Sequence, residues 1–246
     1  MENYFNNRAS VRNFNDKEIS QSELREIIEE AMHAPTCGNM QLYSVVITKD
    51  KDKLKELIPF HFSQPAAQSA NVILTICADF NRFTQWCEAK NASPGYDNFH
   101  SFLNAFTDAV IFAQQIVTIA EMKGLGTCYL GTVIYNPKQI SELLRLPDLV
   151  IPVACIAMGN YDNKPAISSR LPLEAVIHEE EYVQKSDEEI INLFKIKEEE
   201  DGAQQFIKEN NKENIAQVYT DVRYPGEQNV AMSEIYLNLL KEKKFL

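Results

Sequence analysis

The segment Arg8-Ala9-Ser10-Val11-Arg12-Asn13-Phe14 places two arginines four positions apart, with a serine midway between them. If the segment is extended, alternation puts Arg8, Ser10 and Arg12 on one face. If it is helical, the i,i+4 spacing still brings the two arginines together. Paired guanidinium groups beside a hydroxyl are suited to binding a phosphate monoester. Two solvated surface arginines are the alternative interpretation.

A helix and a second polar cluster follow this segment. Ser20-Gln21-Ser22-Glu23 is typical of a capping box, and apolar residues recur at helical spacing from Leu24 to Ala31. Pro35 ends the helix. The residues Thr36 to Gln41 are rich in small and amide side chains, whose donors and acceptors match the edge of a heteroaromatic ring. A plain polar turn before a strand is the alternative.

Other elements are predicted from apolar runs and from the residues that break them. Residues 97–123 form the longest helical pattern, with a wide apolar stripe and Gly124 at the C′ position. Loops are predicted at residues 60–67 and 80–96. In the second loop, Phe80, Phe83, Trp86 and Tyr96 either line a planar substrate or cover the core. The remaining predictions are strands at 43–48, 72–77, 128–133 and 150–158, helices at 50–58 and 136–145, and an extended segment at 170–182.

Composition limits the classes of partner and compartment. The net charge of −11 disfavours nucleic acid and anionic membranes as partners. The chain has no apparent signal peptide and no run of 18 apolar residues. Five cysteines without C-x-x-C spacing indicate reduced thiols in a cytoplasm. The four histidines show no metal-ligand spacing, so we expect no metal site.

Four segments together resemble one known family. Arg-x-Ser-x-Arg-x-Phe at residues 8–14 and Ala-Pro-Thr-x-x-Asn-x-Gln at residues 34–41 are similar to the opening of the FMN-dependent nitroreductase family. Residues 124–131 resemble its glycine-containing segment beside the flavin, and residues 170–178 resemble its Arg-x-Pro-x-x-x-x-x-His segment. Residues 76–82 and the length of the C-terminal region resemble the oxygen-insensitive, NADPH-preferring nitroreductase and flavin reductase branch. The matches lie in register from about residue 8 to residue 182.

The resemblance implies an α+β, nitroreductase-like fold with a central, mostly antiparallel sheet flanked by helices. It also implies a homodimer whose interface includes the long helix. We expect residues 1–185 to form the FMN-binding core. Residues 186–246 contain too few apolar positions for a core of their own, so we expect them to form a helical extension packed on the core or on a partner subunit.

The resemblance further implies bound FMN and NADPH or NADH as co-substrate, with small aromatic or quinone acceptors and no catalytic side chain. Arg8, Ser10 and Arg12 would hold the phosphate together with Arg170. The amide-rich segment would reach the flavin from the second subunit, and Gln68 and the backbone of residues 129–132 would line the ring. The implied cofactor-binding residues are Arg8, Ala9, Ser10, Arg12, Thr36, Cys37, Asn39, Gln41, Gln68, Tyr129, Leu130, Gly131 and Arg170.

The chain departs from the family pattern at three places. Ala9 replaces a frequent second basic residue, and Leu42-Tyr43 replaces a frequent Pro-Trp. Ser168 stands where a phosphate-neutralising lysine is usual, and Lys164 is a candidate to replace it. Two alternatives to nitroreductase or flavin reductase activity remain open. One is a flavoenzyme of the same fold with other redox chemistry, such as dehalogenation or flavin breakdown, and the other is a flavin-binding protein without turnover.

Overall fold

A computed structural model describes residues 4–246. The chain divides into two compact units. The first unit comprises Met1–Pro165 and Met232–Leu246, and the second comprises Ala166–Ala231. The division predicted from the sequence, at residue 185, remains a prediction.

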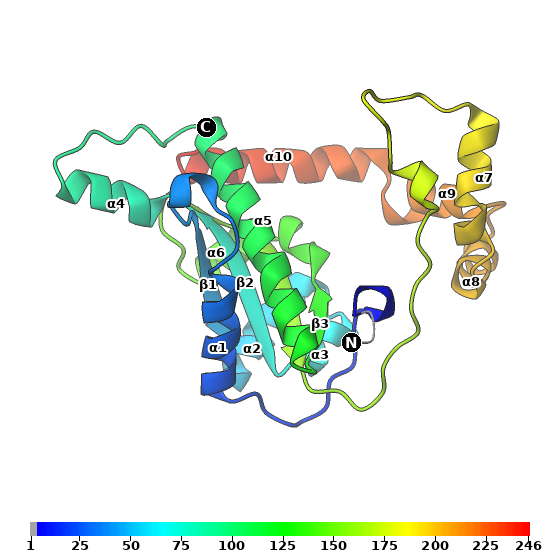
Figure 1. The fold of residues 1–246 in the computed structure, drawn as a ribbon, viewed down its shortest axis with the longest axis horizontal. Coiled ribbons are helices and arrows are strands. Elements are labelled where there is room, and N and C mark those ends of the chain that lie inside the picture. Colours follow the sequence, from blue (N-terminus) through cyan, green and yellow to red (C-terminus); the bar gives the residue numbers. More distant parts are fainter. Residues whose placement is uncertain (1–3) are drawn as a thin grey trace. The chain divides into compact units, whose positions relative to one another are not determined.

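A four-stranded sheet lies at the centre of the first unit (Figure 1). Its strands are β1 (Tyr43–Thr48), β2 (Val72–Asp79), β3 (Gly126–Tyr129) and β4 (Val150–Gly159), in the order β1-β2-β4-β3. Each neighbouring pair is antiparallel. The inner strands β2 and β4 are buried along their whole length, which explains why they are continuous apolar runs in the sequence. The predicted α+β fold with an antiparallel sheet is confirmed.

Helices cover both faces of the sheet. On one face lie α1 (Gln21–Ala31) and α5 (Phe99–Met122), which cross the sheet side by side (Figure 1). On the other face lie α2 (Lys51–Leu57), α3 (Pro65–Ser69) and α6 (Pro137–Leu143). Leu239, Leu240 and Phe245 join the core on the α5 side, so the end of the chain belongs to the first unit. Helix α5 is long and apolar enough to span a membrane by composition alone, but here it packs on the sheet as a core helix.

The ends of α1 and α5 show how the sequence sets the helix boundaries. The Ser20 hydroxyl accepts a hydrogen bond from the Glu23 amide at 3.1 Å, so Ser20 is the N-cap of α1. Within residues 4–246 the return bond to the Glu23 side chain, which the predicted capping box requires, is not formed. Gly124 follows the C-cap of α5 with φ +89°. Around it, the Leu125 amide bonds the Ala120 carbonyl at 3.0 Å, and the Gly124 amide bonds the Glu121 carbonyl at 3.1 Å. These two bonds form a Schellman motif. The motif requires a left-handed residue at its C′ position, and glycine adopts that conformation without a Cβ clash.

Pro152 lies inside β4, which is an inner strand. A proline there donates no hydrogen bond to the ladder, so it is normally found near a strand end or at a bulge. The register between β2 and β4 shifts between Ile76 and Cys77, and Cys77 is opposite Pro152. The irregular pairing accommodates the proline close to the start of the strand.

Several local predictions were wrong. The predicted loop at 60–67 contains the end of a 3₁₀ helix, η3 (Ile58–His61), and the start of α3. The predicted loop at 80–96 contains α4 (Asn81–Ala89), of which only Cys87 is buried. Phe80, Phe83 and Cys87 do lie at helical spacing, but this short apolar pattern was interpreted as irregular. The strand predicted at 128–133 ends at Tyr129. After the Leu130 amide bonds the Cys155 carbonyl at 2.8 Å, the chain turns into the 3₁₀ helix η4 (Gly131–Ile134).

The second unit is helical. Its elements are the short 3₁₀ helix Leu173–Ala175, α7 (Asp187–Glu198), α8 (Asp201–Glu209), α9 (Ile215–Val218) and the π-helix Tyr219–Arg223, followed by the start of α10 (Gly226–Glu242). Ser186 and Glu189 form the reciprocal bonds of a capping box. The buried cluster of this unit is small, with Ala203, Ile215 and Val218 at its centre. Its apolar side chains, such as Ile191 and Tyr182, are largely exposed.

Candidate functional site

Residues 8–12, the basic segment, lie extended beside β3. The Val11 amide donates to the Thr127 carbonyl at 3.0 Å, and Val11 is buried, whereas Arg8 and Ser10 are half-buried and Arg12 is exposed. The extended alternative is therefore correct, and alternation places the two arginines and the serine opposite Val11. Gly126 permits this close approach, since a Cβ at that position would lie 2.8 Å from the Val11 Cβ.

Glu121, near the end of α5, orients Arg8. Its carboxylate accepts hydrogen bonds from Arg8 Nε at 3.2 Å and Nη2 at 3.1 Å. It also accepts from the Tyr4 hydroxyl at 2.7 Å and from the Thr127 hydroxyl. Burial, reinforced by the bond to Glu121, raises the pKa of Tyr4 to about 12, so Tyr4 stays a hydrogen-bond donor at neutral pH. This arrangement leaves Arg8 Nη1 beside Ser10 Oγ at 3.4 Å.

Other groups from the first unit surround the basic segment. Arg8, Glu121 and Lys164 border one cleft of about 310 Å³. Burial raises the pKa of the Cys128 thiol, and the charges of Arg12 and Arg8 oppose that rise. The positive charges of both guanidinium groups are therefore felt at Cys128, near the end of β3. Three cationic side chains, Arg8, Arg12 and Lys164, thus lie in this part of the first unit, and cationic donors of this kind suit a phosphate group.

Residues 36–41, the amide loop, are fixed to the middle of α5 by Asp108. This carboxylate, 2% exposed as a residue, accepts hydrogen bonds from the Thr36 hydroxyl at 2.6 Å and from the Cys37 amide at 2.8 Å. It also accepts from the Leu42 amide at 3.2 Å. Gly38, Asn39 and Gln41 all have φ near +55°, a conformation disfavoured for residues with a Cβ. Strained backbone of this kind persists only where surrounding contacts impose it.

The amide loop offers unused donors and acceptors. Among residues 4–246, the side-chain amides of Asn39 and Gln41 have no hydrogen-bond partner, and Asn39 and Cys37 are exposed. Both amides carry donor and acceptor atoms. The loop is therefore preorganised by Asp108 and open to a polar ring edge.

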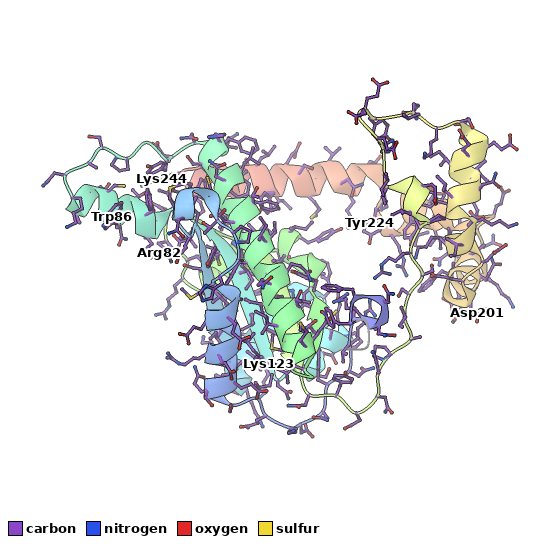
Figure 2. All side chains as sticks on the ribbon, in the orientation of Figure 1. Arg82, Trp86, Lys123, Asp201, Tyr224 and Lys244 are labelled. Atoms are coloured by element: carbon purple, nitrogen blue, oxygen red, sulfur yellow. The ribbon has the colours of Figure 1, made fainter. Side chains whose placement is uncertain are left out.

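One chain does not bring the basic segment and the amide loop together. Asp108 anchors the loop and Glu121 anchors the segment, and the two acids are 121 − 108 = 13 residues apart on one helix. At the α-helical rise this separation is about 20 Å along α5. In Figure 2, Arg82 lies towards one end of the first unit and Lys123 lies at the opposite end of α5.

The other predicted residues of the first unit occupy distinct positions. Gln68 is exposed on α3, donates to the Ser63 carbonyl at 2.5 Å and borders a separate cleft of about 520 Å³. Leu130 is buried, Gly131 is exposed, and Tyr129 is 38% exposed. His61 is fully buried, and its Nδ1 lies 2.9 Å from the Thr132 hydroxyl, so it fixes the turn that carries Gly131.

The aromatic residues of the segment 80–96 were expected either to line a planar substrate or to cover the core, and they differ in exposure. Phe80 is 1% exposed and stacks on Tyr96 at 4.6 Å between ring centroids. Trp86 is 56% exposed and projects from α4 (Figure 2). Phe80 therefore covers the core, and Trp86 is available to a ligand.

Arg170 belongs to the second unit. Its Nη1 donates to the carbonyls of Ser168 and Ser169, each at 3.0 Å. The Lys197 ammonium, on α7, donates to the Ser169 hydroxyl at 2.9 Å. Residues 168–170 therefore have both an arginine and a lysine nearby. The lysine comes from α7, whereas position 168, where the family usually has a lysine, is serine in this sequence. The contact of Arg170 with a phosphate remains a prediction.

The antiparallel sheet, the long covering helix and the two polar clusters define an α+β protein of the nitroreductase type. The family model "Nitroreductase family" matches residues 6–160, and the chain belongs to this family. It is 32% identical over 230 residues to FMN reductase [NAD(P)H] of Bacillus subtilis (strain 168), covering 88% of this chain and 89% of the relative.

Two further relatives are similar to this chain. Oxygen-insensitive NADPH nitroreductase of Salmonella typhimurium is 31% identical over 185 residues, covering 75% of each chain. A crystal structure from Bacteroides fragilis NCTC 9343, whose description names an oxidoreductase, is 45% identical with a TM-score of 0.96 and covers 98% of each chain. The family resemblance seen in the sequence is confirmed.

The sequence analysis missed the acidic residues that support both clusters. Asp108 and Glu121 lie within a helix whose sequence pattern is dominated by a broad apolar stripe, and this pattern does not mark them as functional. A carboxylate on the buried side of such a helix needs charged or hydrogen-bonding partners. That requirement was the available signal, and it points to polar partners on a neighbouring element.

Proposed function

We propose that this chain is an FMN-dependent NAD(P)H oxidoreductase that reduces nitroaromatics, quinones or flavins in a ping-pong cycle. Relatives named FMN reductase and NADPH nitroreductase, at 31–32% identity, support this activity. The observation that carries the proposal is the Glu121-oriented Arg8 beside Ser10, with Arg12 and Lys164 nearby. This donor set suits a flavin phosphate rather than a neutral ligand.

The two polar clusters have side chains that suit the two ends of FMN, its phosphate and its ring. Arg8, Ser10 and Arg12 supply charge and donors for the phosphate. Asn39 and Gln41 supply amides for the ring edge. Bound FMN would supply the hydride-transfer chemistry between the nicotinamide and the acceptor. The protein binds and orients the reactants, and solvent supplies the proton, so no side chain need act as acid or base.

A homodimer would unite the two clusters. Because they lie about 20 Å apart along α5, a second subunit is needed to bring an amide loop to the basic segment of its partner. Helix α5 exposes apolar side chains for such an interface, including Phe99, Leu103 and Ile111 at 37–44%. The second unit also exposes apolar residues that its small core does not cover. We place the dimer in the cytoplasm, with small-molecule partners and with neither nucleic acid nor membrane bound.

An absorption spectrum of the purified protein, followed by one anaerobic addition of NADPH, tests cofactor and reaction together. We expect a yellow protein whose flavin absorbance is bleached by NADPH or NADH and recovers on adding nitrofurazone or a quinone. Recovery only with a halogenated phenol would favour dehalogenation, and consumption of the flavin itself would favour flavin breakdown. A yellow protein that is not bleached would favour a binding protein without turnover. A colourless protein that takes up no added FMN would refute the proposal.

A further inference from the structure

Gln41, in the amide loop, has a backbone conformation that must be held by its neighbours. Its φ is +55°, in the left-handed region that residues with a Cβ avoid. Its own amide donates to the Thr36 hydroxyl at 2.8 Å, and the following amide, of Leu42, donates to Asp108 at 3.2 Å. Its carbonyl accepts from Arg82 Nη2 at 2.5 Å. Both peptide groups that define this φ and ψ are therefore bonded.

Arg82, on α4, is the side chain among residues 4–246 that bonds the Gln41 carbonyl. Besides Gln41, its Nη2 donates to the Tyr43 carbonyl at 3.0 Å, and its Nη1 donates to the Ser44 hydroxyl at 3.0 Å. The carbonyls of residues 41 and 43 face the open edge of β1, which is an edge strand. A planar guanidinium can bond several acceptors in fixed geometry, which an ammonium group does less well.

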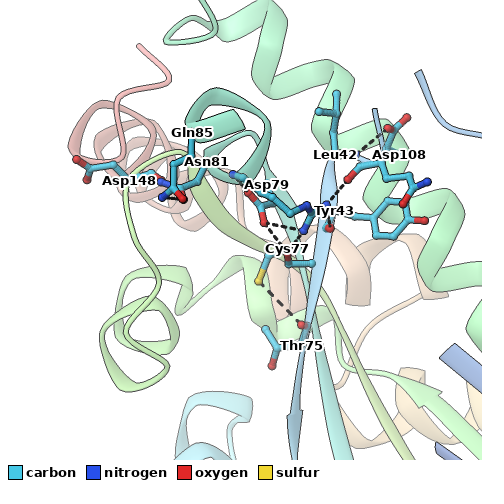
Figure 3. Close-up of polar contacts among 12 residues, drawn as sticks. Leu42, Tyr43, Thr75, Cys77, Asp79, Asn81, Gln85, Asp108 and Asp148 are labelled. Atoms are coloured by element: carbon cyan, nitrogen blue, oxygen red, sulfur yellow. Dashed lines mark hydrogen bonds and ion pairs between the residues drawn. The ribbon is translucent and has the colours of Figure 1, made fainter. Parts of the chain in front are cut away.

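Asp79, the last residue of β2, holds Arg82 in place. Its side chain is 8% exposed and lies 3.5 Å from Arg82 Nη1. It also accepts from the Arg82 backbone amide at 3.2 Å and from the Ser44 hydroxyl. Figure 3 shows Asp79 beside Tyr43, with the bond between Leu42 and Asp108 on the other side of the strand. Two acids, one directly and one through Arg82, thus fix the end of the amide loop.

We propose that Arg82, anchored by Asp79, is a positioning residue that holds the backbone of Gln41 and thereby presents the amide loop to the flavin. The inference rests on the proposed function for its ligand, but the clamp itself is a property of the apoprotein. Since Arg82 lies in the first turn of α4, its side chain links the amide loop to that helix. Loss of Arg82 frees the Gln41 end of the loop, while Asp108 still holds Thr36 and Cys37. The core stays closed, because the Arg82 side chain is 56% exposed.

Amide hydrogen exchange of the apoprotein, followed by mass spectrometry, tests the clamp. In Arg82→Met we expect exchange in peptides covering residues 36–44 to accelerate about tenfold, as for loss of a hydrogen bond to a charged group, with little change in the β2 and β4 peptides. Arg82→Lys should restore part of the protection. The matched control is Arg25→Met, since Arg25 is exposed on α1 and makes no hydrogen bond or ion pair within residues 4–246. Equal exchange in wild type and Arg82→Met would overturn the inference.

FMN affinity, measured by quenching of flavin fluorescence, tests the consequence. We expect the dissociation constant to rise on the order of tenfold in Arg82→Met, to recover partly in Arg82→Lys and to be unchanged in Arg25→Met. A released loop with unchanged affinity would overturn the link to the flavin. A wild-type protein that binds no FMN would refute the proposed function, while the exchange experiment would still decide the clamp. If Arg82→Met does not fold, Asp79→Asn removes the charge that anchors Arg82 at almost the same side-chain volume, and unchanged exchange of residues 36–44 in that variant would overturn the inference.

Discussion

Asp108 and Glu121 interrupt the apolar face of α5, and each collects hydrogen-bond donors from a different polar cluster. Asp108 bonds the amide loop, and Glu121 bonds Arg8. Neither acid is placed to touch a ligand directly, because its oxygens are already occupied by protein donors. At the scale of single residues, the site depends on side chains that orient other side chains.

The two arginines of the basic segment should differ in their effects. Arg8 is paired with Glu121, whereas Arg12 is exposed and makes no bond within residues 4–246. We expect Arg12→Gln to weaken FMN binding by about 1.5–3 kcal/mol, the value of a charge-assisted contact, with the urea-unfolding free energy of the apoprotein unchanged. Arg8→Gln should weaken binding and also lower stability, since it leaves Glu121 short of partners. Equal stability losses in both variants would contradict this assignment.

His61 should make stability depend on pH. Burial lowers the pKa of His61 from about 6.5 to about 4, so the imidazole is neutral in the folded protein and charges more readily when unfolded. The unfolded state therefore binds more protons between pH 6.5 and 4, and stability is full above pH 6.5 and falls as pH decreases. The loss is roughly 3 kcal/mol over that window.

The variant His61→Gln isolates this effect, because its amide side chain can hydrogen-bond but does not titrate. Urea-unfolding free energies measured from pH 7.5 to 4.5 should fall less steeply in His61→Gln than in wild type. His33→Gln is the control, since His33 is exposed, and its profile should follow wild type. Parallel profiles for wild type and His61→Gln would show that His61 titrates normally.

At the scale of elements, the predictions held where the residue pattern and the packing agree. Helices α1 and α5 have broad apolar faces and clear caps, and β2 and β4 are continuous apolar runs. The helix at 81–89 was missed because it is short and buries only Cys87, although Asp79 three residues before Arg82 and the spacing of Phe80, Phe83 and Cys87 were local signals for it. The segment 131–134 failed because its apolar residues fit a 3₁₀ turn as well as a strand.

The end of α5 can be tested with a pair of glycines. A Cβ would meet nothing within 4 Å at either Gly124 or Gly95, but only Gly124 has a positive φ, +89°. We expect Gly124→Ala to lower the free energy of unfolding by about 1–2 kcal/mol, the cost of a left-handed residue with a Cβ. Gly95→Ala should change it little. Equal values from thermal or urea unfolding would show that the Schellman motif does not require glycine.

At the scale of the whole molecule, we expect two chains to be needed for one complete flavin site. The test is light scattering on wild type and on Ile111→Glu, which places a charge on the exposed face of α5. Wild type should have twice the 28.1 kDa chain mass, and Ile111→Glu should be monomeric with FMN binding lost.

The control for the dimer test is Gln139→Glu, which adds the same charge at an exposed position of α6, and it should remain dimeric with FMN bound. A wild-type monomer that binds FMN tightly would contradict the two-subunit site. A monomeric Ile111→Glu that keeps full FMN affinity would contradict it as well.

The sequence alone was sufficient for the family, the α+β class, the main helices and strands and the two polar clusters, because caps, periodicity and short motifs are local properties of the chain. Strand order, the helical state of residues 81–89 and the support given by Asp108, Glu121 and Arg82 were decided only by the tertiary structure. Arg82 and Gln41 are 41 residues apart along the chain, and Glu121 and Arg8 are 113 apart. Contacts between such distant residues depend on how the sheet and α5 bring them together, and no local pattern records that arrangement.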